Sequence, residues 1–207
     1  MKRRSPRFRF LVFGCVLAAG FVLFPARAEA HLNSTGLGPV YDGLLHFCLS
    51  PEDLLPVLAL SLYAGQRGIA YGRRLLFLLP AAWLLGGLAG LGHATNITAA
   101  NAIVSVLSLL LMGGLLAAAA KLPPEWFLGI VLALGASHGY FNAAGLGKPD
   151  ERGLAVLGIV TAVFIFVALS AAFAVTVRQH WARIALRVTG SWIAACGILL
   201  AGWAVRK

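Results

Sequence analysis

The chain has 207 residues, of which 60% are hydrophobic and 12% are charged. Soluble globular domains average about 25% charged residues, so this composition excludes an ordinary water-soluble domain. The formal net charge of +10 would suit a nucleic-acid-binding protein, but the basic residues lie before and between long apolar stretches, which favours a membrane protein and argues against nucleic acid as a partner.

The N-terminal segment has the three parts of a secretory signal peptide. A basic stretch, 2–9, precedes an apolar run, 10–24, and the sequence Ala-Glu-Ala that ends at Ala30 is typical of a cleavage site. Residues 1–30 are therefore predicted to be a cleavable signal peptide, with an uncleaved membrane anchor as the alternative. In both cases the chain from His31 onward begins outside the cytoplasm.

Six apolar segments follow. Each is close to the length that crosses a hydrocarbon core of about 30 Å, and short connections make consecutive segments antiparallel neighbours. Their expected bounds are 42–65, 74–92, 99–120, 125–146, 153–177 and 188–204. Residues 31–207 are thus predicted to form one all-α domain, a polytopic transmembrane helical bundle with six spans.

The loops after the first, third and fifth segments hold most of the basic residues of this domain. These residues are Arg67, Arg73, Arg74, Lys121, Arg178, Arg183 and Arg187. Basic loops stay in the cytoplasm. The mature N-terminus is therefore predicted on the extracytoplasmic side of a bacterial-type inner (plasma) membrane, which agrees with the signal peptide.

Small residues indicate where helices approach closely. Gly86 and Gly90 form a GxxxG pattern in the second segment, and Gly113, Gly114 and Ala117 form a small face in the third. In lipid, such faces allow close backbone packing between helices. We interpret them as packing signals.

The first segment contains an imidazole and two adjacent carboxylates. Ser50 and Pro51 are typical of a helix start, with Glu52 and Asp53 in its first turn and Ser50 as the N-cap of a variant capping box. We therefore expect a broken or re-entrant segment, with a half-segment that carries His46, a break at Ser50-Pro51 and then a helix. Broken helices of this kind commonly form transporter binding sites. The alternative is that the two acids only cap a helix at the membrane surface.

Two later segments add polar groups. In the fourth, His138 and Asn142 are four residues apart and share a helix face, where an imidazole nitrogen and an amide oxygen suit a divalent cation. The alternative is an interhelical hydrogen bond. In the third, Asn101, Ser105, Ser108 and Met112 are spaced for one face. This stripe either lines an ion path, with Met112 as a soft transient ligand, or makes ordinary interhelical hydrogen bonds.

Two further histidines are weaker metal-ligand candidates. His93, at the outer end of the second segment, could collect a cation at the mouth of a path or serve at the membrane interface. His31 could chelate a metal through its α-amine and imidazole if cleavage leaves it N-terminal.

The residues around His46 and His138 resemble those of the HupE/UreJ family, membrane proteins of hydrogenase and urease systems. Members carry a first-segment motif H-P-x-x-G-x-D-H-x-x-x-M after a secretion signal, and a histidine-glycine motif in a later segment. Here His46 matches the first histidine, Glu52 falls on the aspartate, and Asp53 replaces the second histidine. His138-Gly139 matches the later motif.

Other motif positions differ from the family pattern. Phe47, Ser50 and Val57 replace its proline, glycine and methionine, and Asn142 stands near the place of a further histidine. Losing a histidine and a methionine while gaining a carboxylate makes the predicted site richer in oxygen, which leaves Ni²⁺, Co²⁺, Mn²⁺, Fe²⁺ and Zn²⁺ all open.

The resemblance implies a secondary transporter for a divalent transition-metal ion, nickel or cobalt, with no permanently bound cofactor and no enzymatic activity. The expected metal ligands are His46, Glu52, Asp53, His138 and Asn142. The expected partners are the lipid bilayer, the ion and a membrane or metalloenzyme-maturation protein. An intramembrane metal-dependent hydrolase is one alternative, although the chain has no HExxH motif. A non-transporting accessory subunit for metalloenzyme maturation is another.

Overall fold

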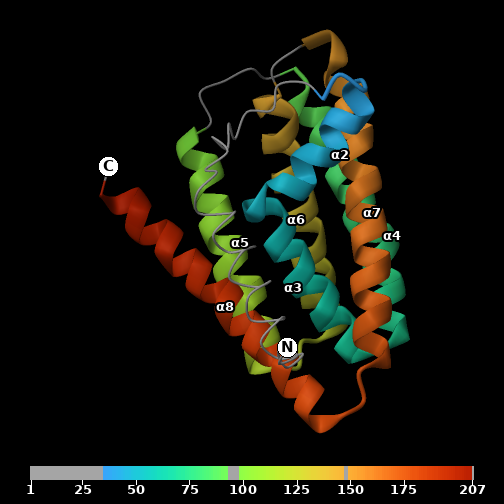
Figure 1. Cartoon of the computed structure of the whole chain (residues 1–207), viewed down its shortest axis with the longest axis vertical. Helices are drawn as coiled ribbons and strands as arrows, with labels where there is room; N and C mark the ends of the chain where they lie inside the picture. Colours follow the sequence, from blue (N-terminus) through green and yellow to red (C-terminus); the bar gives the residue numbers. More distant parts are fainter. Residues whose placement is uncertain (1–34, 93–97, 147–148, 207) are drawn as a thin grey trace, which may run out of the picture. The chain divides into compact units, whose positions relative to one another are not determined.

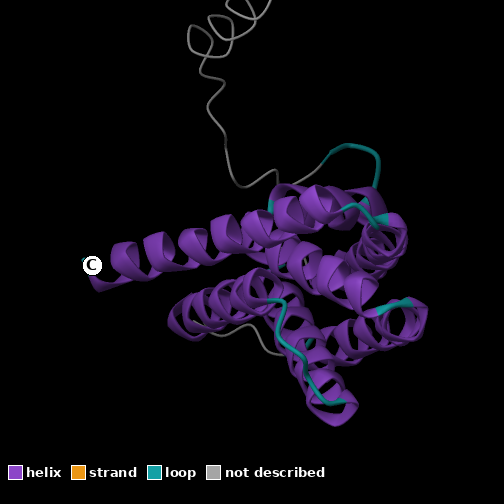
Figure 2. Ribbon diagram, turned by 90° about the horizontal axis from the view of Figure 1, so that it is seen from below, coloured by secondary structure: helices purple, strands orange, loops and turns teal. Residues whose placement is uncertain are grey.

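The computed structural model describes residues 35–92, 98–146 and 149–206, without the side chains of Thr98 and Pro149 (Figure 1). The predicted signal peptide, His31 and His93 lie outside the described residues. Regular structure in the described ranges is helical throughout, without a strand (Figure 2). The helices are α2 (Pro39–Leu49), α3 (Pro51–Arg67), α4 (Ile69–Gly90), α5 (Thr98–Ala118), α6 (Pro124–Gly145), the 3₁₀ helix η1 (Pro149–Glu151), α7 (Arg152–Thr176) and α8 (His180–Val205).

The all-α transmembrane bundle is confirmed. Within the described residues, the five helices from α4 to α8, leaving η1 aside, are long and apolar enough to cross a membrane. The pair α2 and α3 passes the same test together and makes a sixth span if it is counted as one. The chain is thus a multi-pass helical membrane protein.

The predicted break in the first span is also confirmed. α2 ends at Leu49, α3 begins at Pro51, and the two axes differ by 72°. The predicted capping box is wrong, because the Ser50 hydroxyl donates to the backbone oxygen of His46 at 2.7 Å and makes no cap bond to α3. At a break, one helix leaves free carbonyls and the next leaves free N–H groups. This hydroxyl satisfies one of the carbonyls, that of His46.

Two helices begin earlier than their apolar segments indicate. α4 begins at Ile69 instead of 74 and so includes Arg73, and α8 begins at His180 instead of 188. Long basic side chains can extend toward water while the helix continues past the hydrocarbon core. Hydropathy therefore marks the apolar part of these two helices and not the polar turns with which they begin.

Glycines bring α4 and α6 into backbone contact at the level of His138. A Cβ atom on Gly86 or Gly90 of α4 would overlap a carbonyl oxygen of α6, and one on Gly139 would overlap the carbonyl oxygen of Trp83. The small face of Gly113 packs against α8, whereas Gly114 faces open space. The GxxxG prediction is confirmed, and the predicted face on the third segment is confirmed at Gly113.

Helix α3 occupies the middle of the described bundle, packed against α4, α5 and α7 (Figure 1). Its far end is fastened to the C-terminal end of α5. The Tyr63 hydroxyl donates to the backbone oxygen of Ala120 at 2.8 Å, and the Arg67 guanidinium donates to the oxygens of Ala119 and Ala120. A cation at a helix C-terminus is favourable, so this end of α3 is fixed while its first turn faces the polar cluster described next.

Candidate metal site

The centre of the candidate site is a buried pair formed by Asp53, in the first turn of α3, and His138, in the middle of α6. Asp53 Oδ1 lies 2.7 Å from His138 Nδ1, and the two residues are 5% and 2% exposed. Burying a carboxylate is costly unless it is paired. The break at Ser50 allows the pairing, because it starts a new helix whose first turn points into the bundle.

Ser108 of α5 fixes the protonation pattern of His138. The Ser108 hydroxyl donates to the backbone oxygen of Ser105 at 3.0 Å, and its oxygen lies 3.1 Å from His138 Nε2. Since the single hydroxyl proton is already used, the Ser108 oxygen accepts a hydrogen bond from Nε2–H. The hydrogen bond of 2.7 Å between Nδ1 and Asp53 Oδ1 then needs a second proton, which lies between these two atoms.

A second pair lies one helical turn away. Asn142 of α6 donates its Nδ2–H to the backbone oxygen of His138 at 2.9 Å, which orients the amide so that Oδ1 faces His46 of α2. His46 Nε2 lies 2.8 Å from that oxygen and donates to it, because an amide oxygen only accepts. The His46 Nδ1 lone pair is then free to bind a cation.

Glu52 stands beside the pair on the exposed side of the α3 start. Its Oε2 accepts from the Ser105 hydroxyl at 3.5 Å, a long and weak bond. Glu52 and His46 are exposed, whereas Asp53, His138 and Asn142 are buried. The polar side chains thus extend from the surface to the interior of the bundle around the break between α2 and α3.

The structure brings the five predicted ligands into one neighbourhood, four of them in two pairs joined along α6 and Glu52 beside them. Within the described residues, no three His, Cys, Asp or Glu side chains come together as a ready metal-binding group. Both polar atoms of Asn142 are engaged in hydrogen bonds, so its observed contacts are those of a residue that orients His46. Met112 is 1% exposed and belongs to the apolar core.

Sequence reasoning missed two residues of this neighbourhood. One is Ser108, which belongs to the polar stripe predicted on α5; its spacing from Ser105 is the signal that could assign it to the site. The other residue is Trp83 of α4, whose ring centroid lies 5.5 Å from that of His138. Nothing in the local sequence distinguishes Trp83 from a lipid-facing tryptophan.

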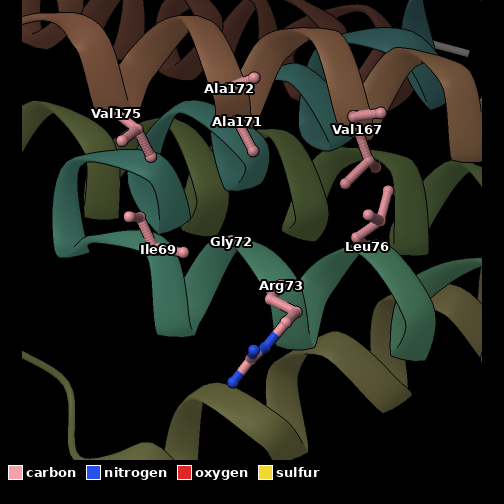
Figure 3. Close-up of a pocket in the computed structure, with 9 residues that line it drawn as sticks. Ile69, Gly72, Arg73, Leu76, Val167, Ala171, Ala172 and Val175 are labelled. Atoms are coloured by element: carbon pink, nitrogen blue, oxygen red, sulfur yellow. The ribbon is translucent and has the colours of Figure 1, made fainter.

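A groove elsewhere in the bundle has no ligand chemistry. It lies between α4 and α7, has a volume of about 310 Å³, and is lined by aliphatic side chains, Gly72 and Arg73. In Figure 3 the Arg73 guanidinium extends away from α7. The chemistry-bearing side chains are at the break between α2 and α3 instead.

Comparison with protein families gives the same answer as the motif residues. The family model described as HupE / UreJ protein matches residues 18–200, most of the chain. The chain belongs to the HupE/UreJ family. Searches among curated proteins and among solved structures gave no match. The HupE/UreJ family is a transporter and accessory family associated with nickel and cobalt uptake for hydrogenase and urease.

Two residues that differ from the HupE/UreJ motif lie at the candidate site. Asp53, which stands where the motif has its second histidine, is the carboxylate paired with His138. Phe47, in place of the motif proline, is fully buried and packs on Trp83. The chain therefore has a carboxylate–imidazole pair at the centre of the site.

Proposed function

We propose that this HupE/UreJ protein is a secondary transporter for a divalent transition-metal ion, nickel or cobalt, and that the ion binds between His138 and Asp53. The observation that carries the proposal is the buried contact of 2.7 Å between His138 Nδ1 and a carboxylate oxygen of Asp53, where a bound ion would take the place of the proton that the two atoms share. A nitrogen and an anionic oxygen facing one another are a usual pair of ligands for such ions. The Nε2–H bond to Ser108 is the outer hydrogen bond that orients metal-binding histidines.

Inserting an ion requires a small opening of the pair. Bonds of about 2.1 Å to each atom would place Nδ1 and Oδ1 about 3.0 Å apart at a right angle and about 3.4 Å apart at a tetrahedral angle. The present separation is 2.7 Å. A shift of less than about 1 Å between α3 and α6 therefore makes room for the ion.

Charge balance favours a divalent ion. With the ion bound, ionised Asp53 and Glu52 would together supply two negative charges and offset the two positive charges of the ion, so the loaded site would be close to neutral. A bare divalent ion inside a bilayer is strongly unfavourable, and intramembrane carboxylates typically mark ion paths.

His46 is proposed to receive the ion first. It is exposed, its Nδ1 is free, and Asn142 ties it to the helix that carries His138. The non-helical residue Ser50 between α2 and α3 is a place where the half-helix can turn and bring His46 toward the buried pair. In the proposed topology, His46 and the break between α2 and α3 face the extracytoplasmic side of the inner membrane.

Uptake into proteoliposomes tests this function. We expect saturable uptake of Ni²⁺ or Co²⁺ by the unmodified protein, and its loss in His46→Ala and in His138→Ala. His180→Ala is the matched control, because His180 is an exposed residue at the start of α8 and should leave uptake unchanged.

Other outcomes separate the alternatives. Normal uptake by the His46→Ala/His138→Ala double variant would contradict the proposed site. Absence of uptake by the unmodified protein, together with its co-purification with a maturation protein, would favour the accessory role. Tight stoichiometric zinc with substrate turnover would favour the hydrolase.

A further inference from the structure

Trp83 links the two histidine-bearing helices. Its ring lies 5.5 Å from that of His138 on α6, at an interplanar angle of 38°. On α2, Phe47 follows His46 directly and packs edge-on against the same indole at 6.0 Å. Phe47 and Trp83 are 0% and 1% exposed, so neither ring can move independently. The positions of His46 and His138 are therefore coupled through one indole on a third helix.

The indole nitrogen of Trp83 also lacks a partner. Among the buried side-chain nitrogen and oxygen atoms of the described residues, Trp83 Nε1 and Gln66 Nε2 are those without a hydrogen bond. An indole N–H can only donate, and leaving a buried donor unpaired is unfavourable. Buried unpaired groups of this kind occur where a ligand or water completes the bonding.

We propose that Trp83 is a positioning residue of the ion site: its ring holds His138 and α2 in place, and its N–H is the donor for an oxygen ligand of the bound ion, such as a retained water. This rests on the proposed function and adds a ligand-holding residue to it. A transition-metal ion held by one imidazole and one carboxylate has further coordination positions, and oxygen ligands fill them. A free N–H on a ring that packs against the imidazole could orient such a ligand and so favour one coordination geometry.

The face of the indole contributes in the same direction. An imidazole that binds a metal ion becomes more positive, and an aromatic face within about 6 Å of a cation attracts it. The Trp83 ring lies within that distance of the His138 ring.

Co²⁺ titration of the detergent-solubilised full chain tests the proposal, because Co²⁺ reports its coordination geometry by its visible absorption and quenches nearby indole fluorescence. Trp83→Phe keeps a ring and removes the N–H. We expect it to bind Co²⁺ about threefold to tenfold more weakly, the amount that one lost hydrogen bond represents, with an altered visible spectrum. Quenching by Co²⁺ should be smaller than in the unmodified protein, while the melting temperature stays near that of the unmodified protein.

Trp192→Phe is the matched control, because Trp192 is 71% exposed on α8 and should leave Co²⁺ affinity, spectrum and quenching unchanged. Identical Co²⁺ affinity and spectrum in Trp83→Phe and the unmodified protein would overturn the inference and leave the His138 site standing, provided that His138→Ala abolishes binding. If the Trp83→Phe protein does not fold, Phe47→Leu is tested instead. This substitution removes only the contact between Trp83 and α2, and it should also weaken Co²⁺ binding. Unchanged binding in Phe47→Leu, or no binding by the unmodified protein, would overturn the inference, the latter together with the proposed function.

Discussion

Asp53→Asn separates the role of the carboxylate in ion binding from its role in folding. Asparagine has nearly the shape of aspartate, and its amide can donate to the Nδ1 lone pair of His138. The imidazole would then keep a partner at both nitrogens, Ser108 included. A hydrogen bond to a charged group contributes about 1.5–3 kcal/mol and a neutral one about 0.5–1.5 kcal/mol, so we expect a stability loss of about 1 kcal/mol.

The effect on the ion should be much larger. The substitution removes one of the two negative charges beside the proposed ion and puts an N–H where an anionic oxygen was. Changing a group that only supports a metal ligand lowers metal affinity about 10- to 100-fold. Loss of a ligand should reach at least the upper end, about 100-fold, which is about 2.8 kcal/mol.

Ni²⁺ or Co²⁺ uptake measured against concentration in proteoliposomes gives the change in half-saturation, and thermal unfolding of the same preparation gives the stability. Asp150→Asn is the matched control, because Asp150 is an exposed acid of η1 and the same chemical change there should affect neither quantity. A half-saturation for Asp53→Asn within threefold of the unmodified protein would refute the reasoning. Unfolding of Asp53→Asn, with the affinity of the folded fraction unchanged, would make Asp53 a purely structural residue.

Three further variants test the surroundings of the site. Asn142→Ala removes the acceptor that orients the exposed imidazole, so half-saturation should rise about 10- to 100-fold; an unchanged uptake curve would show that this hydrogen bond is irrelevant to transport. Gly139→Ala puts a methyl group against a carbonyl oxygen of α4 and should cost about 1–3 kcal/mol in thermal unfolding, whereas Gly129→Ala, on the same helix with open space around it, should cost nothing; equal melting temperatures would contradict the close packing. Arg67→Gln removes a cation from the C-terminal end of α5 and should lower stability by about 1 kcal/mol more than Arg73→Gln does, as measured by thermal unfolding; no difference would mean that this contact does not stabilise the bundle.

Much of the fold could be predicted from the sequence because hydropathy and helix-break signals are local. Stretches of about 20 apolar residues are typical of helices that cross a membrane. Ser50-Pro51 marks the break regardless of the surrounding bundle. The ends of α4 and α8 were missed because basic side chains such as Arg73 can leave the membrane while their backbone stays helical. The hydroxyl of Ser50 was misassigned because two helix ends compete for it, and only the bend between them decides which one it serves.

The residues of the candidate site could be predicted from the sequence, whereas most contacts between them could not. Helical spacing predicted that His138 and Asn142 share one face of α6, and both are buried on that helix. The pairing of Asp53 with His138 joins positions 85 residues apart, and no local pattern specifies it. The contact of Trp83 with His138 likewise depends on the glycine packing of α4 against α6, which the sequence indicates without giving its register.

The most direct measurement is the location of the ion in the protein. A structure of the full chain saturated with Co²⁺, with the metal identified by its anomalous scattering, should place the ion about 2.1 Å from both His138 Nδ1 and Asp53 Oδ1. These two atoms should have moved apart from their present 2.7 Å to about 3 Å or more. A saturated protein in which the hydrogen bond between Asp53 and His138 persists, with Co²⁺ bound elsewhere, would contradict the account.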